Sequence, residues 1–130
     1  MRKRTAIRAA LGTALAVAGS LFVLPSAAQA VYTCQKGEVC IFSDHGLRGT
    51  TLVVYSGKHN FTSNWHFYNG LAANDNASSI VNKTDITVFV SSDFNDLGKV
   101  AVVWPGTKME FTGQNGSLDD NTMSSINVYA

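Results

Sequence analysis

An internal repeat is the feature that most restricts how this chain can fold. Residues 49–57 (GTTLVVYSG) align with residues 98–106 (GKVAVVWPG) at an offset of 49. Phe61-Thr62 aligns with Phe111-Thr112 at an offset of 50, and the Ser-Ser-Ile of residues 78–80 recurs at 124–126, at an offset of 46. Two copies of about 45 residues predict two similar units, each of which buries its apolar face against the other.

Within each copy, short apolar alternations are separated by Gly, Asn, Asp and Ser. Their β-branched and aromatic residues favour strands, and no window keeps a helical apolar period. We expect an all-β fold of two Greek-key units, about residues 38–83 and 84–130, packed as a sandwich. A helical turn is expected at 71–73 at most. The expected strands are 39–42, 50–55, 80–82, 86–90, 99–104 and 126–129.

The first thirty residues have the pattern of a secretory signal peptide. A basic start precedes the apolar run 9–24, and Ala28-Gln29-Ala30 predicts cleavage after Ala30. The mature chain would be residues 31–130, a single exported domain of a bacterium, and we expect a monomer. It keeps six basic residues against nine acidic ones, a net charge of 6 − 9 = −3. Nucleic acid is therefore not an expected partner, and no basic amphipathic segment suggests a membrane surface.

The cysteines predict a disulfide. Cys34 and Cys40 are the two cysteines of the chain, and a close pair in an exported protein is best explained as a bond. The spacing is not that of a CxxC redox site. A zinc site would need two further ligands, and His45, His59 and His66 do not have ligand-like spacing with the cysteines.

A polar motif occurs twice, as NDNASS at residues 74–79 and as DNTMSS at residues 120–125. Calcium prefers six to eight hard oxygen ligands, which Asn, Asp, Ser, Thr and backbone carbonyls supply. The same residues form ordinary turns, because their side chains bond the nearby backbone. Two copies at equivalent places of a repeat favour the metal over the turn.

At this point the chain resembles the microbial, secreted βγ-crystallin domains. Their calcium signature is two Asn or Asp residues, two free positions, Ser or Thr, then Ser, and both motifs match it. Residues 42–49 are similar to the family's opening hairpin, with Leu47 where an aromatic is usual. In the second unit the spacing from Phe89 to Gly98 is two residues longer than that from Phe42 to Gly49. The resemblance covers nearly all of residues 38–130.

The βγ-crystallin resemblance implies that each calcium lies between the units. It implies that Ser79 and Ser125 are structural serines that bond the first hairpins. The implied metal site comprises the hydroxyls of Ser78 and Ser124, the carbonyls of Asn76 and Thr122, the side chains of Asp75 and Asn121, the loop-ordering residues Asn74 and Asp120, and Asp44 and Asp93 from the first hairpins.

A second resemblance competes with the first. Residues 34–42 (CQKGEVCIF) are similar to the N-terminal stretch of the secreted actinobacterial metalloprotease inhibitors of peptidase inhibitor family I36, which share the Greek-key fold. Those inhibitors typically carry a second disulfide that braces a reactive loop, and no cysteine follows Cys40 here. Killer-toxin-like secreted proteins are related by fold, but no residue singles them out.

No motif favours an enzyme. The chain has no G-x-S-x-G and no H-E-x-x-H, and Glu38 and Glu110 stand isolated in the sequence. The aromatic stretch 64–68 (NWHFY) is compatible with a sugar-stacking surface, but we expect it to close the core. We therefore predict a calcium-binding protein whose two Greek keys are braced by Ca²⁺. The alternative is an inhibitor that binds a secreted protease.

Overall fold

The computed structural model describes residues 31–129; the predicted signal peptide, residues 1–30, lies outside them. Val31–Ala130 is one compact unit. Eight strands and one short 3₁₀ turn make up this unit. They are β1 (Val39–Asp44), β2 (Arg48–Val54), β3 (Gly57–Asn60), β4 (Ser79–Asn82), β5 (Val88–Ser91), η3 (Phe94–Asp96), β6 (Val100–Val103), β7 (Lys108–Glu110) and β8 (Ser125–Val128).

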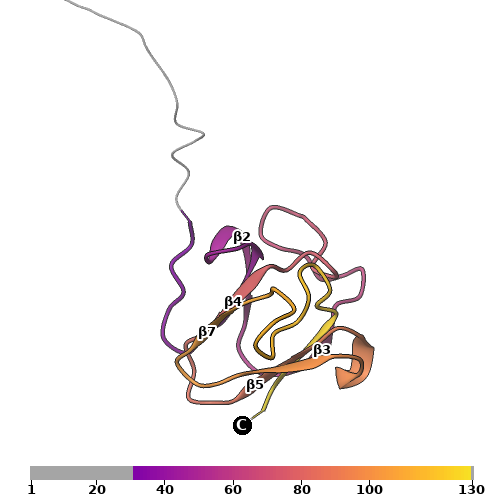
Figure 1. Ribbon diagram of the computed structural model, residues 1–130. Coiled ribbons are helices and arrows are strands. Elements are labelled where there is room, and N and C mark those ends of the chain that lie inside the picture. The colour runs from indigo at the N-terminus through magenta and orange to yellow at the C-terminus, as the bar shows by residue number, and fades with distance from the viewer. Residues whose placement is uncertain (1–30, 130) are drawn as a thin grey trace, which may run out of the picture. The chain divides into compact units, whose positions relative to one another are not determined.

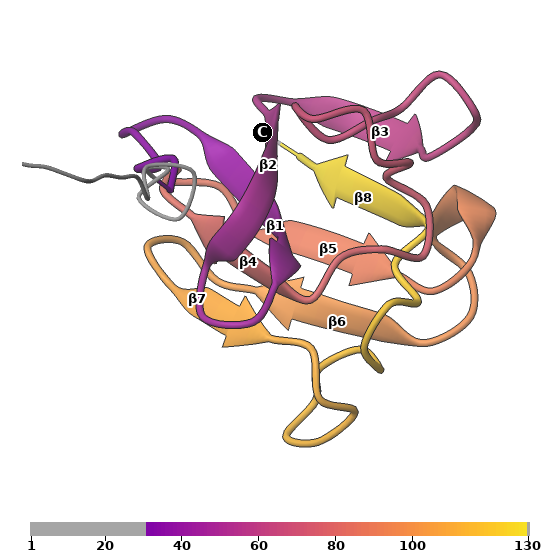
Figure 2. The same ribbon diagram turned by 90° about the horizontal axis from the view of Figure 1, so that it is seen from above.

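The strands form two antiparallel four-stranded sheets, which confirms the predicted all-β fold. The orders are β2-β1-β4-β7 in the first sheet and β3-β8-β5-β6 in the second. Figure 1 shows β7 beside β4, and Figure 2 shows β3 beside β8. Each sheet therefore holds three strands of one Greek-key unit and one strand of the other. This exchange joins the two units through main-chain hydrogen bonds.

Alternation along the strands places the core between the two sheets. On β1, Val39 and Ile41 face inward, and on β5, Val88 and Val90 do the same. Aromatic residues from the connecting loops complete the core, among them the repeat-related pair Phe61 and Phe111. The other face of the first sheet carries a separate small cluster of Cys40, Phe42 and Val81.

Strand register corrects the alignment of the two opening hairpins. Phe42 pairs with Ser79, and Ser91 pairs with Ser125. The equivalent of Phe42 is therefore Ser91 rather than Phe89, and the spacing from each of them to the hairpin glycine, Gly49 or Gly98, is the same. The longer spacing in the second unit came from matching one phenylalanine to another.

All six expected strands are present, with ends shifted by up to two residues. The expectation missed β3 and β7, because these are short and largely polar. The helical turn expected at 71–73 was wrong: Ala72 forms a β-bridge with His66 there. Among residues 31–129, no helix is long and apolar enough to span a bilayer.

The predicted disulfide is confirmed. Cys34 and Cys40 are bonded at 2.05 Å with a Cα–Cα distance of 5.9 Å. Glu38 lies beside them, but both sulfurs are consumed by the bond, so this group offers no thiolate to a metal.

Glu38 is a buried carboxylate, 8 % exposed. It accepts hydrogen bonds from the backbone N–H of Gln35 at 2.9 Å, from Tyr32 Oη at 2.7 Å and from Tyr55 Oη at 3.2 Å. These bonds, first the one from Gln35 and then those from the tyrosines, lower the pKa of Glu38 below its ordinary value. The same contact raises the pKa of both tyrosines. The carboxylate thus ties the N-terminal segment to β1 and to the residue that follows β2.

Candidate metal centre

The two signature loops, residues 74–79 and 120–125, cross each other between the units. The backbone N–H of Asp75 donates to the carbonyl of Met123 at 3.0 Å, and that of Asn121 donates to the carbonyl of Ala77 at 3.1 Å. Since the two loops are repeat copies at an offset of 46, these two bonds are the same contact made in both directions. The crossing therefore has an approximate two-fold symmetry.

The side chains repeat that reciprocity. Ser124 Oγ donates to Asp75 Oδ1 at 3.2 Å, and Ser78 Oγ donates to Asn121 Oδ1 at 3.4 Å. Both serines are buried. Asp75 and Asn121 adopt left-handed backbone conformations, with φ of 61° and 60°, which Asn and Asp tolerate better than most residues. Each position pairs a serine hydroxyl of one loop with a carboxylate or amide oxygen of the other.

Further oxygens lie at the same crossing. The carbonyl of Thr122 is 3.4 Å from Ser124 Oγ, so this hydroxyl has two oxygen neighbours, Asp75 Oδ1 and the Thr122 carbonyl. Oxygens about 3 Å apart can share one calcium at its usual bond lengths of about 2.3–2.6 Å. The amide oxygen of Asn74 is buried with no hydrogen-bond partner among residues 31–129. A buried polar atom without a partner is costly, and a cation or a water would satisfy it.

The remaining signature residues have local roles. The Asn76 amide donates to the carbonyl of Ala72 at 2.9 Å and so orders its loop. Asp120 Oδ2 accepts from the amide of the neighbouring Asn121 at 3.4 Å. It also lies 3.4 Å from His45 Nε2, which comes from the first hairpin. Asn76 and Asp120 therefore contact their own loops and His45, whereas the contacts between the two loops are made by Asp75, Ser78, Asn121 and Ser124.

Asp44 and Asp93 reach this region through their backbone. Ser79 Oγ donates to the carbonyl of Asp44 at 2.6 Å, and Ser125 Oγ donates to that of Asp93 at 2.7 Å. Ser79 and Ser125 therefore bond the two first hairpins, as the βγ-crystallin resemblance implies. The two carboxylates lie over their own hairpins, where a Cβ on Gly49 or on Gly98 would come within 2.9 Å and 2.8 Å of their Oδ2 atoms. The hydroxyls of Ser43 and Ser92 lie closer still, and these contacts together with the positive φ of both residues explain the glycine in each hairpin.

The two exchanged strands, β7 and β3, form hydrogen bonds to these hairpins. The sequence did not reveal these contacts. Glu110 on β7 accepts from the backbone N–H of Gly46 at 2.9 Å and contacts His45 Nδ1 at 3.0 Å. In the other copy, Asn60 on β3 exchanges two hydrogen bonds with Asn95, at 3.0 and 2.8 Å. The offset of 50 that aligns Phe61 with Phe111 also aligns Asn60 with Glu110. This alignment could have indicated that the two residues have equivalent roles.

His45 lies between two carboxylates and couples the first hairpin to the second signature loop. The hydrogen bond that Glu110 accepts from His45 has the largest effect on the pKa of the imidazole, and the charge of Asp120 acts in the same direction. Together they raise the pKa of His45, although partial burial opposes them. Because the carboxylates contact opposite ring nitrogens, the His45 ring bridges Glu110 and Asp120.

The aromatic stretch 64–68 has divided roles. Phe67 is buried in the core, and the Trp65 ring packs on Phe61 and His59 at centroid distances of 5.5 and 4.8 Å. These contacts agree with the expected closure of the core. Tyr68 differs, since it is 95 % exposed at the tip of its loop.

Comparison with known proteins identifies the family of this chain. Residues 27–103 match the model of peptidase inhibitor family I36, which is more than half of the 130-residue chain. The chain belongs to peptidase inhibitor family I36. The match ends after β6, so the second signature loop of this family member lies beyond it. No curated protein matched the sequence.

Solved structures place this I36 family member in the βγ-crystallin fold. It is similar to a structure described for the evolution of the eye-lens βγ-crystallin domain fold, with 22% identity, a TM-score of 0.59 and coverage of 77% of this chain and 92% of that one. A βγ-crystallin from Ciona intestinalis matches with 26% identity, a TM-score of 0.55 and coverage of 71% and 99%. A βγ-crystallin domain from Flavobacterium johnsoniae matches with 22% identity, a TM-score of 0.54 and coverage of 71% and 93%. Both resemblances noted in the sequence are thereby confirmed.

Proposed function

We propose that this I36 family member is an exported calcium-binding protein in which Ca²⁺ braces the two Greek keys. The observation that carries the proposal is the reciprocal crossing of the signature loops, where Ser124 meets Asp75 and Ser78 meets Asn121. Two buried hydroxyls, each beside a carboxylate or amide oxygen of the other unit, form a donor set suited to calcium. The disulfide supports export, because such bonds persist in oxidising compartments.

The chain's own residues would hold each ion from both units. Ser124, Thr122 and Asp75 would supply one site, and Ser78 and Asn121 the related one, with Asn74 and Asp120 ordering the loops. The backbone of the hairpins at Asp44 and Asp93 is held beside the sites by Ser79 and Ser125. Calcium supplies a cross-link between oxygens of the two units, and stabilises the fold by about 2.7 kcal/mol at a hundredfold excess over Kd.

The test is thermal unfolding of residues 31–130 in calcium, in magnesium and in EDTA. Calcium should raise Tm by more than about 4 °C, since about 1 kcal/mol produces such a shift in a domain of this size. Magnesium should not, because it demands a tighter octahedral site. Ser78→Ala combined with Ser124→Ala should abolish the calcium effect but leave the apo protein folded. Ser63→Ala, at an exposed serine outside the crossing, is the matched control. A full calcium effect in the double variant would refute the ligand assignment.

Peptidase inhibition is the second candidate, and the family match over residues 27–103 favours it. The disulfide between Cys34 and Cys40 is the single one within residues 31–129, so any reactive loop there is held by hydrogen bonds. The assay is titration of a secreted zinc metallopeptidase at constant calcium, because chelation would inactivate the enzyme itself. Stoichiometric inhibition, with the chain intact by mass spectrometry, would support this function. Activity unchanged at a large excess of the protein would exclude it for that enzyme.

A further inference from the structure

The outward face of the first sheet is apolar at its centre. Cross-strand pairing places Val53, Cys40, Val81 and Lys108 side by side in one row across β2, β1, β4 and β7. Phe42 lies in the next row and is buried, like Cys40 and Val81, although all three face away from the core. Something other than the second sheet must therefore cover them.

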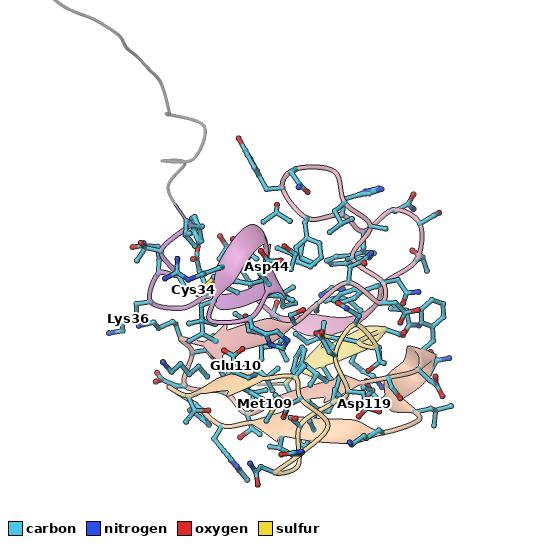
Figure 3. The ribbon with its side chains drawn as sticks, turned by 45° about the horizontal axis from the view of Figure 1, so that its top comes forward. Cys34, Lys36, Asp44, Met109, Glu110 and Asp119 are labelled. Atoms are coloured by element: carbon cyan, nitrogen blue, oxygen red, sulfur yellow. A yellow bond between two sulfur atoms is a disulfide. The ribbon has the colours of Figure 1, made fainter. Side chains whose placement is uncertain are left out.

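Part of the cover comes from Leu47 and Val53, and part from Cys34 in the segment of residues 31–36, which we call the N-terminal strap. The disulfide fastens it at Cys34 to the outward-facing Cys40, and the Tyr32 hydroxyl fastens it to the Glu38 carboxylate. Figure 3 shows Cys34 and Lys36 on this strap, next to the first sheet. The strap is thus held at two points over an apolar surface.

The strap leaves a cavity of about 490 Å³ between itself, β4 and β7. Leu47 and the largely buried Phe42 and Val81 line it on the side of the sheet, and Tyr32, Thr33 and Cys34 line it on the side of the strap. This volume lies within the range of small-molecule sites, about 300–1,000 Å³. Leu47 adopts a left-handed conformation with φ of 59°, which is uncommon for a leucine, and its side chain packs against the apolar cluster. The first hairpin thereby closes one end of the cavity.

The lip of the cavity is cationic. Lys83 and Lys108 line it, and both side chains are exposed. Within residues 31–129 neither forms an ion pair, whereas Lys58 and Lys99 pair with Asp96 and Asp119. The nearby acid, Glu38, is buried and already accepts three hydrogen bonds. An anion at the lip would therefore meet two positive charges and no competing carboxylate among the lining residues.

We propose that this cavity binds a small amphipathic carboxylate. The apolar chain would lie against Leu47 and the exposed ring of Tyr32, above the nearly buried Phe42 and Val81, and the carboxylate would lie between Lys83 and Lys108. Both parts are needed, because an exposed ion pair alone contributes little, while the apolar lining alone does not select for charge. The site is on the outer face of the sheet, away from the crossing of the signature loops.

The test uses octanoate as the probe and ¹⁵N–¹H spectra of residues 31–130 as the readout. EDTA is present throughout, so that binding of the carboxylate to calcium does not contribute. Octanoate should shift the amides of the strap, of Val81 and of Lys108 in a saturable manner. Acetate lacks the chain and 1-octanol lacks the charge, so both should bind more weakly than octanoate. Shifts confined to other regions, or octanol binding as tightly as octanoate, would overturn the proposal.

Charge removal gives the second arm of the test. Lys83→Gln combined with Lys108→Gln should weaken octanoate binding by about five- to tenfold, which corresponds to two exposed ion pairs. Lys36→Gln removes a lysine of the strap that does not line the cavity, and should leave the affinity unchanged. Both lysines of the lip are exposed, so the double variant should fold normally. An unchanged affinity in the double variant would refute the role of the lip.

Discussion

The two proposed calcium sites should differ in affinity, because one pairs a serine with a carboxylate and the other pairs a serine with an amide. Asp75 faces Ser124, and Asn121 faces Ser78. Both side chains are exposed, so the water-like dielectric applies, and a −1 charge about 3 Å from a +2 ion contributes about 3 kcal/mol. The carboxylate and the ion lose hydration on binding, which offsets part of this energy. The two sites should then differ by about 1–2 kcal/mol in binding free energy, or about five- to thirtyfold in Kd.

The perturbation is therefore a pair of isosteric exchanges, Asp75→Asn and Asn121→Asp. The first should weaken the tighter site by that factor, and the second should tighten the weaker site by a similar one. Calorimetric titration gives the two affinities, and the amide signals of Ser78 and Ser124 report which site fills. Asn64→Asp adds the same charge at an exposed position outside the crossing and is the control. The reasoning fails if Asp75→Asn leaves both affinities unchanged, or if the control shifts them equally.

Three further predictions concern the fold. Ser125→Ala, like Ser79→Ala, should lower the free energy of unfolding by about 1–3 kcal/mol, because it leaves polar groups of the hairpin without a hydrogen bond. Urea titration with and without calcium should give the same loss. Full rescue by calcium would contradict this prediction. The low pKa of Glu38 adds stability above its unfolded pKa of about 4.3, and this contribution is lost as the pH falls through the lower folded pKa. Thermal unfolding between neutral and strongly acidic pH should therefore be less pH-dependent in Glu38→Gln, and an unchanged profile would count against the buried contact. Gly98→Ala should destabilise by more than the same change at Gly106, because its Cβ would overlap Ser92 Oγ while that of Gly106 meets open space; equal losses by denaturant titration would show that the left-handed conformation alone matters.

The repeat and the strand alternation carried most of the fold prediction. They located six strands and the doubled unit, because runs of β-branched residues between turn residues indicate strands without knowledge of tertiary contacts. They did not locate β3 and β7, whose residues are mostly polar and whose partners belong to the other unit. Only pairing with β8 and β4 makes strands of Gly57–Asn60 and Lys108–Glu110.

The sequence pointed to residues that come together in the structure, but it did not show how they are arranged. The doubled signature named Asp75, Ser78, Asn121 and Ser124, and the structure gathers them at one crossing. That each loop completes the other depends on the two-fold relation between units, which spacing alone does not contain. Glu110 looked isolated because its partner, the backbone N–H of Gly46, is 64 residues away in sequence.

The exchange of strands between the two units already joins them without calcium. β7 bonds to β4 and β3 bonds to β8, so the units are already joined at two places by main-chain hydrogen bonds. Calcium is therefore not required to hold two separate halves together, and the apo protein can remain folded. The proposed ion would act on the loops themselves, where Asp75 and Asn121 adopt left-handed conformations and the Asn74 oxygen has no partner among the described residues. A bound ion would satisfy this buried oxygen and order the loops, so its expected effect is on stability and loop order rather than on the choice of fold.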